Sequence, residues 1–215
     1  MKIALLHTAE SNIAGFEEAG VKIGLPAGTL VHTVRADLLH AAREAGKLTA
    51  IVAQETAASL QALTENADVV VLTCSTLGPS VEQVRASKVP VLRVDAALAE
   101  RAVCNGGLVV ALCALDTTVE PTTKLFEQAV SKTGAQVEVR LIPDIWHLLL
   151  AGDHAAYYAE IAKAADTAYE AGADIVALAQ ASMMGAAHLV TKGPRPLDSP
   201  SSGLMAAVAA YNPAV

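Results

Sequence analysis

Residues 67–76 read Ala67-Asp-Val-Val-Val-Leu-Thr-Cys-Ser-Thr76, and the pattern returns as Ala173-Asp-Ile-Val-Ala-Leu-Ala-Gln-Ala-Ser182. Each copy is an Asp followed by a run of mostly apolar residues, with small polar residues where the run stops. Such a run is typical of a strand buried in a parallel sheet, whose carboxyl end can reach a site. In the gapless alignment Cys74 corresponds to Gln180, so only one of the two strand ends carries a thiol.

Apolar runs alternate with amphipathic stretches along the rest of the chain, a pattern that predicts βαβ units with parallel sheets and helices on both faces. The expected strands are 2–6, 49–53, 69–73, 90–94, 108–114, 136–142 and 174–179. The expected helices are 35–45, 54–65, 79–87, 119–132 and 154–171, with a further Ala-rich helix at the end of the chain.

The repeat extends beyond the two Ala-Asp segments, because each half opens with a strand that runs into polar residues. The first half has Leu6-His-Thr8, and the second has Leu115-Asp-Thr-Thr118. We therefore expect an α/β protein of two pseudo-symmetric lobes, each a mostly parallel sheet flanked by helices. The first lobe is expected to contain residues 1–100 plus 195–215, and the second residues 101–194.

Composition narrows the class of protein. Of the 215 residues 53% are hydrophobic and 17% charged, which supports a large core and argues against disorder. The net charge of −7 argues against a nucleic-acid partner, and no apolar run is long enough to predict a membrane span. The start of the chain resembles a first strand, not a signal peptide, and three cysteines suggest a reducing compartment. A cytoplasmic protein that forms a homo-oligomer is expected.

Cys74 is the first candidate for chemistry, since it is expected at the carboxyl end of a strand with a helix beginning near Ser80. Backbone amides at a helix start favour a thiolate, which would make Cys74 a base or nucleophile near neutral pH. The alternative is an inert core cysteine, which is common in such strands. Cys104 and Cys113 are expected to be core or incidental cysteines, and no metal-ligand spacing links the three.

A second set of candidates consists of hydroxyl residues that follow strands and could hold a carboxylate together with free backbone amides. The alternative role for these side chains is N-capping. His7 is a further candidate because it ends the first strand. No Gly-x-Gly-x-x-Gly, Walker, His-Glu-x-x-His or Gly-x-Ser-x-Gly motif is present. The hydroxyl candidates are Ser75, Thr76, Thr117, Thr118 and Ser182.

Four segments together resemble the aspartate/glutamate/hydantoin racemase family, in order and spacing more than in residue identity. They are Thr73-Cys-Ser-Thr76, Leu115-Asp-Thr-Thr118, Leu178-Ala-Gln-Ala-Ser-Met183 and Leu197-Asp-Ser-Pro200. The resemblance covers nearly the whole chain. It implies two lobes with a cofactor-free active site in the cleft between them, and one catalytic cysteine from each lobe. No metal is expected in the site.

The first family cysteine maps onto Cys74, and the second maps onto Gln180, which cannot act as an acid or base. The resemblance extends to maleate isomerases, in which a cysteine attacks the substrate, and to arylmalonate decarboxylases, which use one cysteine in the other lobe. It implies a small carboxylate substrate held by the hydroxyl set, by His7 and by Gln180.

Three functions follow from these residues. The first is a cofactor-independent isomerase or racemase acting on a small carboxylate, with Cys74 as base or nucleophile and with His7 or a water near Ser182 returning the proton. The second is a single-cysteine decarboxylase or thiol-dependent hydrolase, and the third is a carboxylate-binding protein without catalysis.

Overall fold

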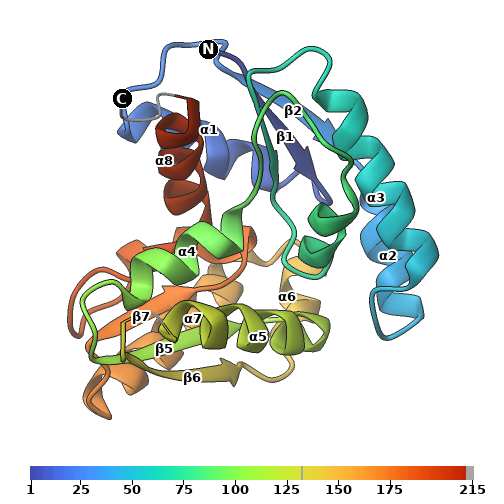
Figure 1. The fold of residues 1–215 in the computed structure, drawn as a ribbon. Coiled ribbons are helices and arrows are strands. Elements are labelled where there is room, and N and C mark those ends of the chain that lie inside the picture. The colour runs from blue at the N-terminus through green and yellow to red at the C-terminus, as the bar shows by residue number, and fades with distance from the viewer. Residues whose placement is uncertain (132, 212–215) are drawn as a thin grey trace. The chain divides into compact units, whose positions relative to one another are not determined.

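Two compact units make up the described part of the chain, residues 1–131 and 133–211 of a computed structural model (Figure 1). The first unit contains Met1–Ala97 and the C-terminal segment that begins at Pro200, and the second contains Leu98–Ser199. Each unit has its own four-stranded sheet, in which all pairings are parallel.

In the first unit the strand order is β2-β1-β3-β4. The strands are β1 (Ile3–His7), β2 (Leu30–Val34), β3 (Val69–Leu72) and β4 (Val91–Arg93). The helices are α1 (Asn12–Lys22), α2 (Ala36–Glu44), α3 (Ala50–Leu63), the 3₁₀ helix η1 (Gly78–Gln83) and α8 (Ser199–Tyr211). Helix α4 (Val94–Val103) contains the boundary between the units.

In the second unit the order is β6-β5-β7-β8, the same arrangement of first, second, third and fourth strand as in the first unit. The strands are β5 (Leu108–Cys113), β6 (Gln136–Leu141), β7 (Ile175–Leu178) and β8 (Leu197–Asp198). The helices are α5 (Val119–Val130), α6 (Trp146–Leu150), α7 (His154–Glu170) and the 3₁₀ helices η2 (Asp116–Thr118) and η3 (Ala181–His188). The α/β class with two parallel-sheet lobes, expected from the sequence, is confirmed.

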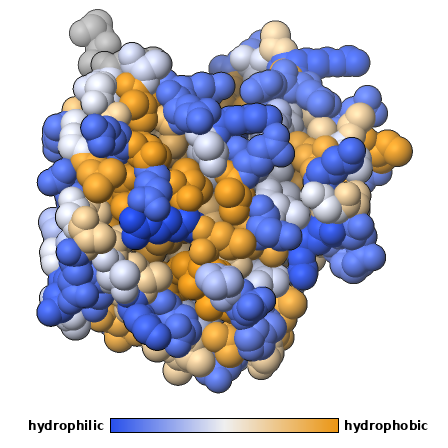
Figure 2. Space-filling model, turned by 90° about the horizontal axis from the view of Figure 1, so that it is seen from below, coloured by the Kyte–Doolittle hydropathy of each residue, from blue (hydrophilic) through white to orange (hydrophobic). Residues whose placement is uncertain are grey.

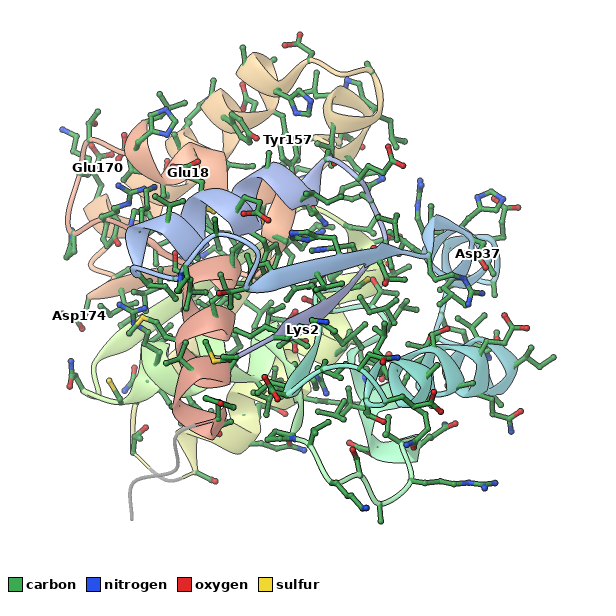
Figure 3. The ribbon with its side chains drawn as sticks, turned by 90° about the horizontal axis from the view of Figure 1, so that it is seen from above. Lys2, Glu18, Asp37, Tyr157, Glu170 and Asp174 are labelled. Atoms are coloured by element: carbon green, nitrogen blue, oxygen red, sulfur yellow. The ribbon has the colours of Figure 1, made fainter. Side chains whose placement is uncertain are left out.

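The aspartates of the repeated segment have the same structural role in both units. Asp68 accepts a hydrogen bond from the Lys2 N–H at 2.6 Å, and Asp174 accepts one from the Leu108 N–H at 2.8 Å. Lys2 and Asp174 are labelled in Figure 3. Gly107 adopts φ +83° beside Asp174, and a Cβ there would lie 2.5 Å from the carboxylate. Each Asp therefore ties the start of one central strand to the start of the next.

Both faces of each sheet are covered by apolar side chains. In the first unit α2 and α3 pack on the face formed by Ala4, Leu6, Val70 and Leu72. In the second unit α7 packs on one face of β5 and β7, while Phe126 of α5 packs on the other. Because both faces are buried, the central strands are continuous apolar runs without polar alternation.

The expected strand at 49–53 is wrong, since these residues form the start of α3. The Thr49 side chain caps this helix and accepts a hydrogen bond from the Val52 N–H at 3.3 Å. Val52 and Ala53 are buried, whereas Ile51 is 70% exposed. The run has one buried helical face, and a short apolar run does not by itself distinguish strand from helix.

Several elements were not expected from the sequence, namely β2, β8, α1, α4 and α6. Strand β2 lies at the edge of its sheet and includes the polar residues His32 and Thr33, so it lacks the apolar run that marks the central strands. The helix expected over 79–87 is the shorter 3₁₀ helix η1.

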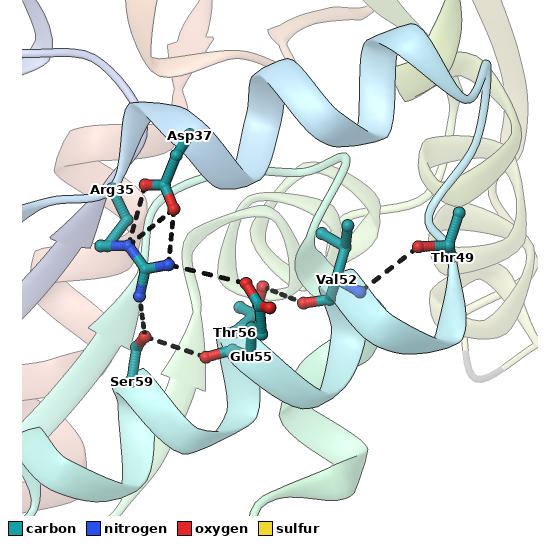
Figure 4. A network of polar contacts seen from close by, with 7 residues as sticks. All are labelled: Arg35, Asp37, Thr49, Val52, Glu55, Thr56 and Ser59. Atoms are coloured by element: carbon teal, nitrogen blue, oxygen red, sulfur yellow. Dashed lines mark hydrogen bonds and ion pairs between the residues drawn. The ribbon is translucent and has the colours of Figure 1, made fainter.

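A polar network joins the end of β2 to α2 and α3 (Figure 4). The Arg35 guanidinium donates hydrogen bonds to the Asp37 carboxylate at 2.6 to 3.1 Å and to Ser59 Oγ at 2.8 Å. Glu55 lies 3.7 Å from the same guanidinium. Arg35 thereby bridges two helices on one side of the first sheet.

No helix among the described residues has the length and apolar character needed to cross a membrane. On the face shown in Figure 2, hydrophobic residues appear at the surface among hydrophilic ones, as expected where charged residues are only 17% of the chain. Among residues 1–131 and 133–211, the large apolar side chains most exposed are Val21, Ile51 and Leu150.

Candidate functional site

Cys74 lies just beyond the carboxyl end of β3, two residues after Leu72. It is half-buried, while Thr73, Ser75 and Thr76 on either side are each at most 3% exposed. All residues from Val69 to Gly78 are buried except Cys74, so Cys74 is the residue at which this segment reaches solvent.

The surroundings of the thiol act on its pKa in opposite directions. Burial raises the pKa of Cys74, and this is the largest effect. Hydrogen bonds from the Thr8 hydroxyl and from the Leu77 and Thr76 backbone N–H groups lower it, and the Asp95 carboxylate raises it. The net direction is upward. The sequence predicts a thiolate favoured by backbone amides. The amides are present, but burial outweighs their effect on the pKa.

An Arg-Asp pair lies beside this segment and was not anticipated from the sequence. Arg93, at the end of β4, donates to Asp95 through Nε at 2.9 Å and through its terminal nitrogen at 2.7 Å. Asp95 is 2% exposed. A Cβ at Gly78 would overlap the Arg93 guanidinium, so a larger residue there would require this side chain to shift. Arg93 thus pairs with the carboxylate whose charge raises the pKa of Cys74.

His7 is fully buried at the end of β1, and protein groups occupy both of its ring nitrogens. Nδ1 lies 2.9 Å from the Thr73 hydroxyl, and Nε2 lies 2.8 Å from His32 Nδ1. Burial and the charge of His32 lower the pKa of His7 to about 3. Binding of substrate by His7 remains a prediction, and it would require one of these bonds to break. The next residue, Thr8, is the one that reaches the Cys74 sulfur.

The hydroxyl candidates of the second unit have defined partners near the ends of β5 and β7. Thr118 is 2% exposed, and its hydroxyl donates to the Leu115 carbonyl. Ser182 is half-buried, and its Oγ lies 3.0 Å from the Tyr157 hydroxyl. Burial raises the pKa of Tyr157, so this group is a neutral phenol near neutral pH. Thr117 is half-buried, and its N–H donates to Asp116.

N-capping, the alternative role that the sequence suggests for these hydroxyls, is not observed in the helices that begin beside them. Thr118 stands at the N-cap of α5 without a side-chain capping bond. The N-cap positions of the three 3₁₀ helices are Leu77, Leu115 and Gln180.

Gln180 follows β7 at the position that corresponds to Cys74, and it is 8% exposed. Its Oε1 accepts a hydrogen bond from the Ala114 N–H at 2.5 Å. Because a backbone N–H can only donate, this bond fixes the amide orientation and leaves Nε2 as a donor. In the first unit the corresponding pair is Thr8 and Cys74, so the same position holds a thiol in one unit and a fixed amide in the other.

Replacing Gln180 with Met should lower the free energy of unfolding by about 1–3 kcal/mol, because the buried Ala114 N–H loses its acceptor. Urea unfolding measures this change. Gln128→Met makes the same chemical change on the exposed side of α5 and should stay within about 0.5 kcal/mol of the native protein. Equal effects of the two substitutions would contradict a structural role for Gln180.

Within residues 1–131 and 133–211, no group of three or more His, Cys, Asp or Glu side chains is arranged to hold a metal ion. The polar groups near Cys74 that sequence reasoning missed are Thr8, Arg93 and Asp95. Thr8 could have been found from its place after the first strand, as the other hydroxyl candidates were.

Comparisons with known proteins extend these observations. The Picrophilus torridus aspartate racemase superposes with a TM-score of 0.72 at 13% identity, over 99% of this chain and 95% of that one. Allantoin racemase from Pseudomonas fluorescens gives a TM-score of 0.64 at 18% identity, over 97% and 90%. Unliganded arylmalonate decarboxylase gives 0.57 at 14% identity, over 100% and 94%. At these identities the likeness concerns the fold alone.

Among curated proteins no sequence matches this one. The family model for Asp/Glu/hydantoin racemases, in contrast, matches residues 9–206, which include β3 and β7 with the residues that follow them. The chain therefore belongs to the Asp/Glu/hydantoin racemase family.

Proposed function

We propose that the protein is a cofactor-independent isomerase that acts on a small carboxylate, with Cys74 as the reacting side chain. The observation that carries the proposal is the half-buried thiol at the end of β3. The Thr8 hydroxyl and two backbone N–H groups point at its sulfur. Three donors at one sulfur stabilise the thiolate whenever the thiol gives up its proton.

Family membership supports an isomerase, and the names of similar structures include aspartate, glutamate and allantoin racemases. A proton taken from a substrate carbon by the Cys74 thiolate leaves an enolate, and it must then be returned to the opposite face. The amide of Gln180 cannot return it. The proposed isomerase therefore works through one thiol, either as a base assisted by water or as a nucleophile that adds to the substrate and leaves again.

Decarboxylation is the second candidate, and the raised pKa of Cys74 favours it. A thiol that keeps its proton near neutral pH can donate this proton to the carbanion left when a carboxylate departs as carbon dioxide. Only one proton donor on one face is needed. The similarity to arylmalonate decarboxylase extends over the whole chain.

Proton NMR in deuterated water distinguishes the candidates. The purified protein is incubated with aspartate, glutamate, maleate and substituted malonates. Exchange of an α-proton, or conversion of maleate to fumarate, with the carbon skeleton intact supports the isomerase. Loss of carbon dioxide with deuterium incorporation supports the decarboxylase. Saturable binding of a carboxylate without turnover of any compound would overturn both and leave a binding protein.

A further inference from the structure

Four hydrogen bonds run in line from a buried carbonyl to the protein surface in the first unit. The Thr73 hydroxyl contacts the Leu6 carbonyl at 3.0 Å and His7 Nδ1 at 2.9 Å. His7 Nε2 contacts His32 Nδ1 at 2.8 Å. His32 Nε2 contacts the Glu17 carboxylate at 2.9 Å. The line crosses β3, β1, β2 and α1.

Parallel pairing places these side chains together. In the register of β1 and β2, His32 is the partner of Leu5, two residues from His7 and on the same face. The two imidazoles are stacked with centroids 5.1 Å apart. Phe16 of α1 packs edge-on against His7, and Glu17 follows it on the helix. The contacts therefore depend on the strands and on α1 together.

The number of hydrogens in the line is the central constraint. Both ends, a carbonyl and a carboxylate, are acceptors only. Between them lie one hydroxyl and two imidazoles, which in their neutral forms carry three hydrogens for four contacts. A fully bonded line therefore requires one additional proton, so that one of the two histidines is an imidazolium.

The additional proton belongs on His32. His7 has no exposed surface, and its pKa of about 3 keeps it neutral at ordinary pH. The His32 side chain is 14% exposed and lies against Glu17, which is 53% exposed. In this state His32 donates to Glu17 and to His7 Nε2. His7 donates from Nδ1 to Thr73, and Thr73 donates to Leu6.

Loss of that proton leaves three hydrogens for four contacts. The Leu6 carbonyl can lose its bond from the hydroxyl at the lowest cost, since it also accepts the Thr73 backbone N–H at 3.1 Å. The Thr73 hydroxyl then donates to His7 Nδ1, and the proton of His7 moves to Nε2 and points at His32. One deprotonation near the surface reverses the direction of both inner hydrogen bonds.

We propose that Glu17, His32, His7 and Thr73 form a proton-linked switch that sets the tautomer of His7 and the direction of the Thr73 hydroxyl beside Cys74. Thr73 immediately precedes Cys74, and Thr8, which bonds the sulfur, immediately follows His7. The switch thus connects the pH at the surface with both segments that hold the thiol. It does not depend on which reaction Cys74 carries out.

Other charged groups near the line are already paired. Glu18, the next residue of α1, bonds Lys22 at 2.5 Å. Arg35, just beyond β2, is held by Asp37. Residues 199–211 of α8 contain no Asp, Glu, Lys, Arg or His. Among the described contacts, the titratable groups facing His32 are Glu17 and His7.

Long-range ¹H–¹⁵N NMR of histidine-labelled protein reports which ring nitrogen carries the proton. In the native protein, His7 should change from the Nδ1–H to the Nε2–H form as the pH rises through about 5–8, the range in which histidines titrate. A His7 tautomer that stays constant over this range would overturn the proposal.

Glu17→Gln tests the hydrogen count directly. The amide of Gln can donate to His32 Nε2, so the line has four hydrogens for four contacts without any additional proton. His7 should therefore stay in the Nδ1–H form over the same pH range in this variant. Glu18→Gln, one residue away and outside the line, should switch as the native protein does. Native-like switching in Glu17→Gln would overturn the proposal, and the readout requires no substrate and no turnover.

Discussion

Replacing Cys74 with Ala is expected to reduce turnover by about 10²–10⁴-fold, the usual contribution of a positioned acid or base. The physical reason is that no other thiol is available in the segments that follow β3 and β7, and Gln180 cannot exchange a proton. The rate is measured by the proton NMR assay in deuterated water, with whichever carboxylate the native protein converts. Circular dichroism checks that the variant is folded.

Cys104→Ala is the matched control, because Cys104 is exposed and lies outside both strand ends. It should leave turnover unchanged. A Cys74→Ala protein that keeps more than about one tenth of the native rate would remove Cys74 from the chemistry.

The thiol can also be examined without a substrate. Thr8→Val removes the hydroxyl that bonds the sulfur, which should raise the pKa of Cys74 further and move the pH profile of its alkylation to higher pH. Thr8→Ser keeps a hydroxyl and should stay close to the native profile. Peptide mass spectrometry after iodoacetamide treatment resolves Cys74 from Cys104. Superimposable profiles for Val and Ser would show that Thr8 does not act on the thiol.

Acid is expected to destabilise the first unit through His7. Its pKa is about 3 in the folded protein and about 6.5 when unfolded, so the unfolded chain binds more protons between these values. Stability present above pH 6.5 is therefore lost as the pH falls toward 3, by up to about 1.4 kcal/mol for each pH unit. Urea unfolding at pH steps from 7 to 4 measures the slope, and hydrogen exchange of β1 assigns it to this unit.

His7→Leu should be less stable than the native protein at pH 7, because Thr73 and His32 lose a partner. Its stability should nevertheless fall less steeply with acid, since nothing titrates at this position. His40→Gln removes an exposed histidine of α2 and should keep the native slope. Parallel slopes for the native and His7→Leu proteins would contradict a buried neutral His7.

The sequence was informative about the central strands for a physical reason. A strand covered on both faces must be apolar along its whole length, so β1, β3, β5 and β7 are visible as runs. The edge strand β2 is half-exposed and includes His32, so its sequence is not a continuous apolar run. The short apolar run from Ile51 to Ala53 predicts a strand, but the Thr49 cap makes these residues the start of α3.

By itself the sequence determined the two parallel sheets, the equivalence of β3 and β7, and the contrast between Cys74 and Gln180, because these follow from local runs and their order. Only the tertiary structure decided the state of the groups around them. Thr8 lies 66 residues before Cys74, and His32 lies 25 residues after His7, so neither contact is encoded by spacing along the chain. Burial and hydrogen bonds act through space, and they set the direction of the Cys74 pKa opposite to the one that the local sequence suggested.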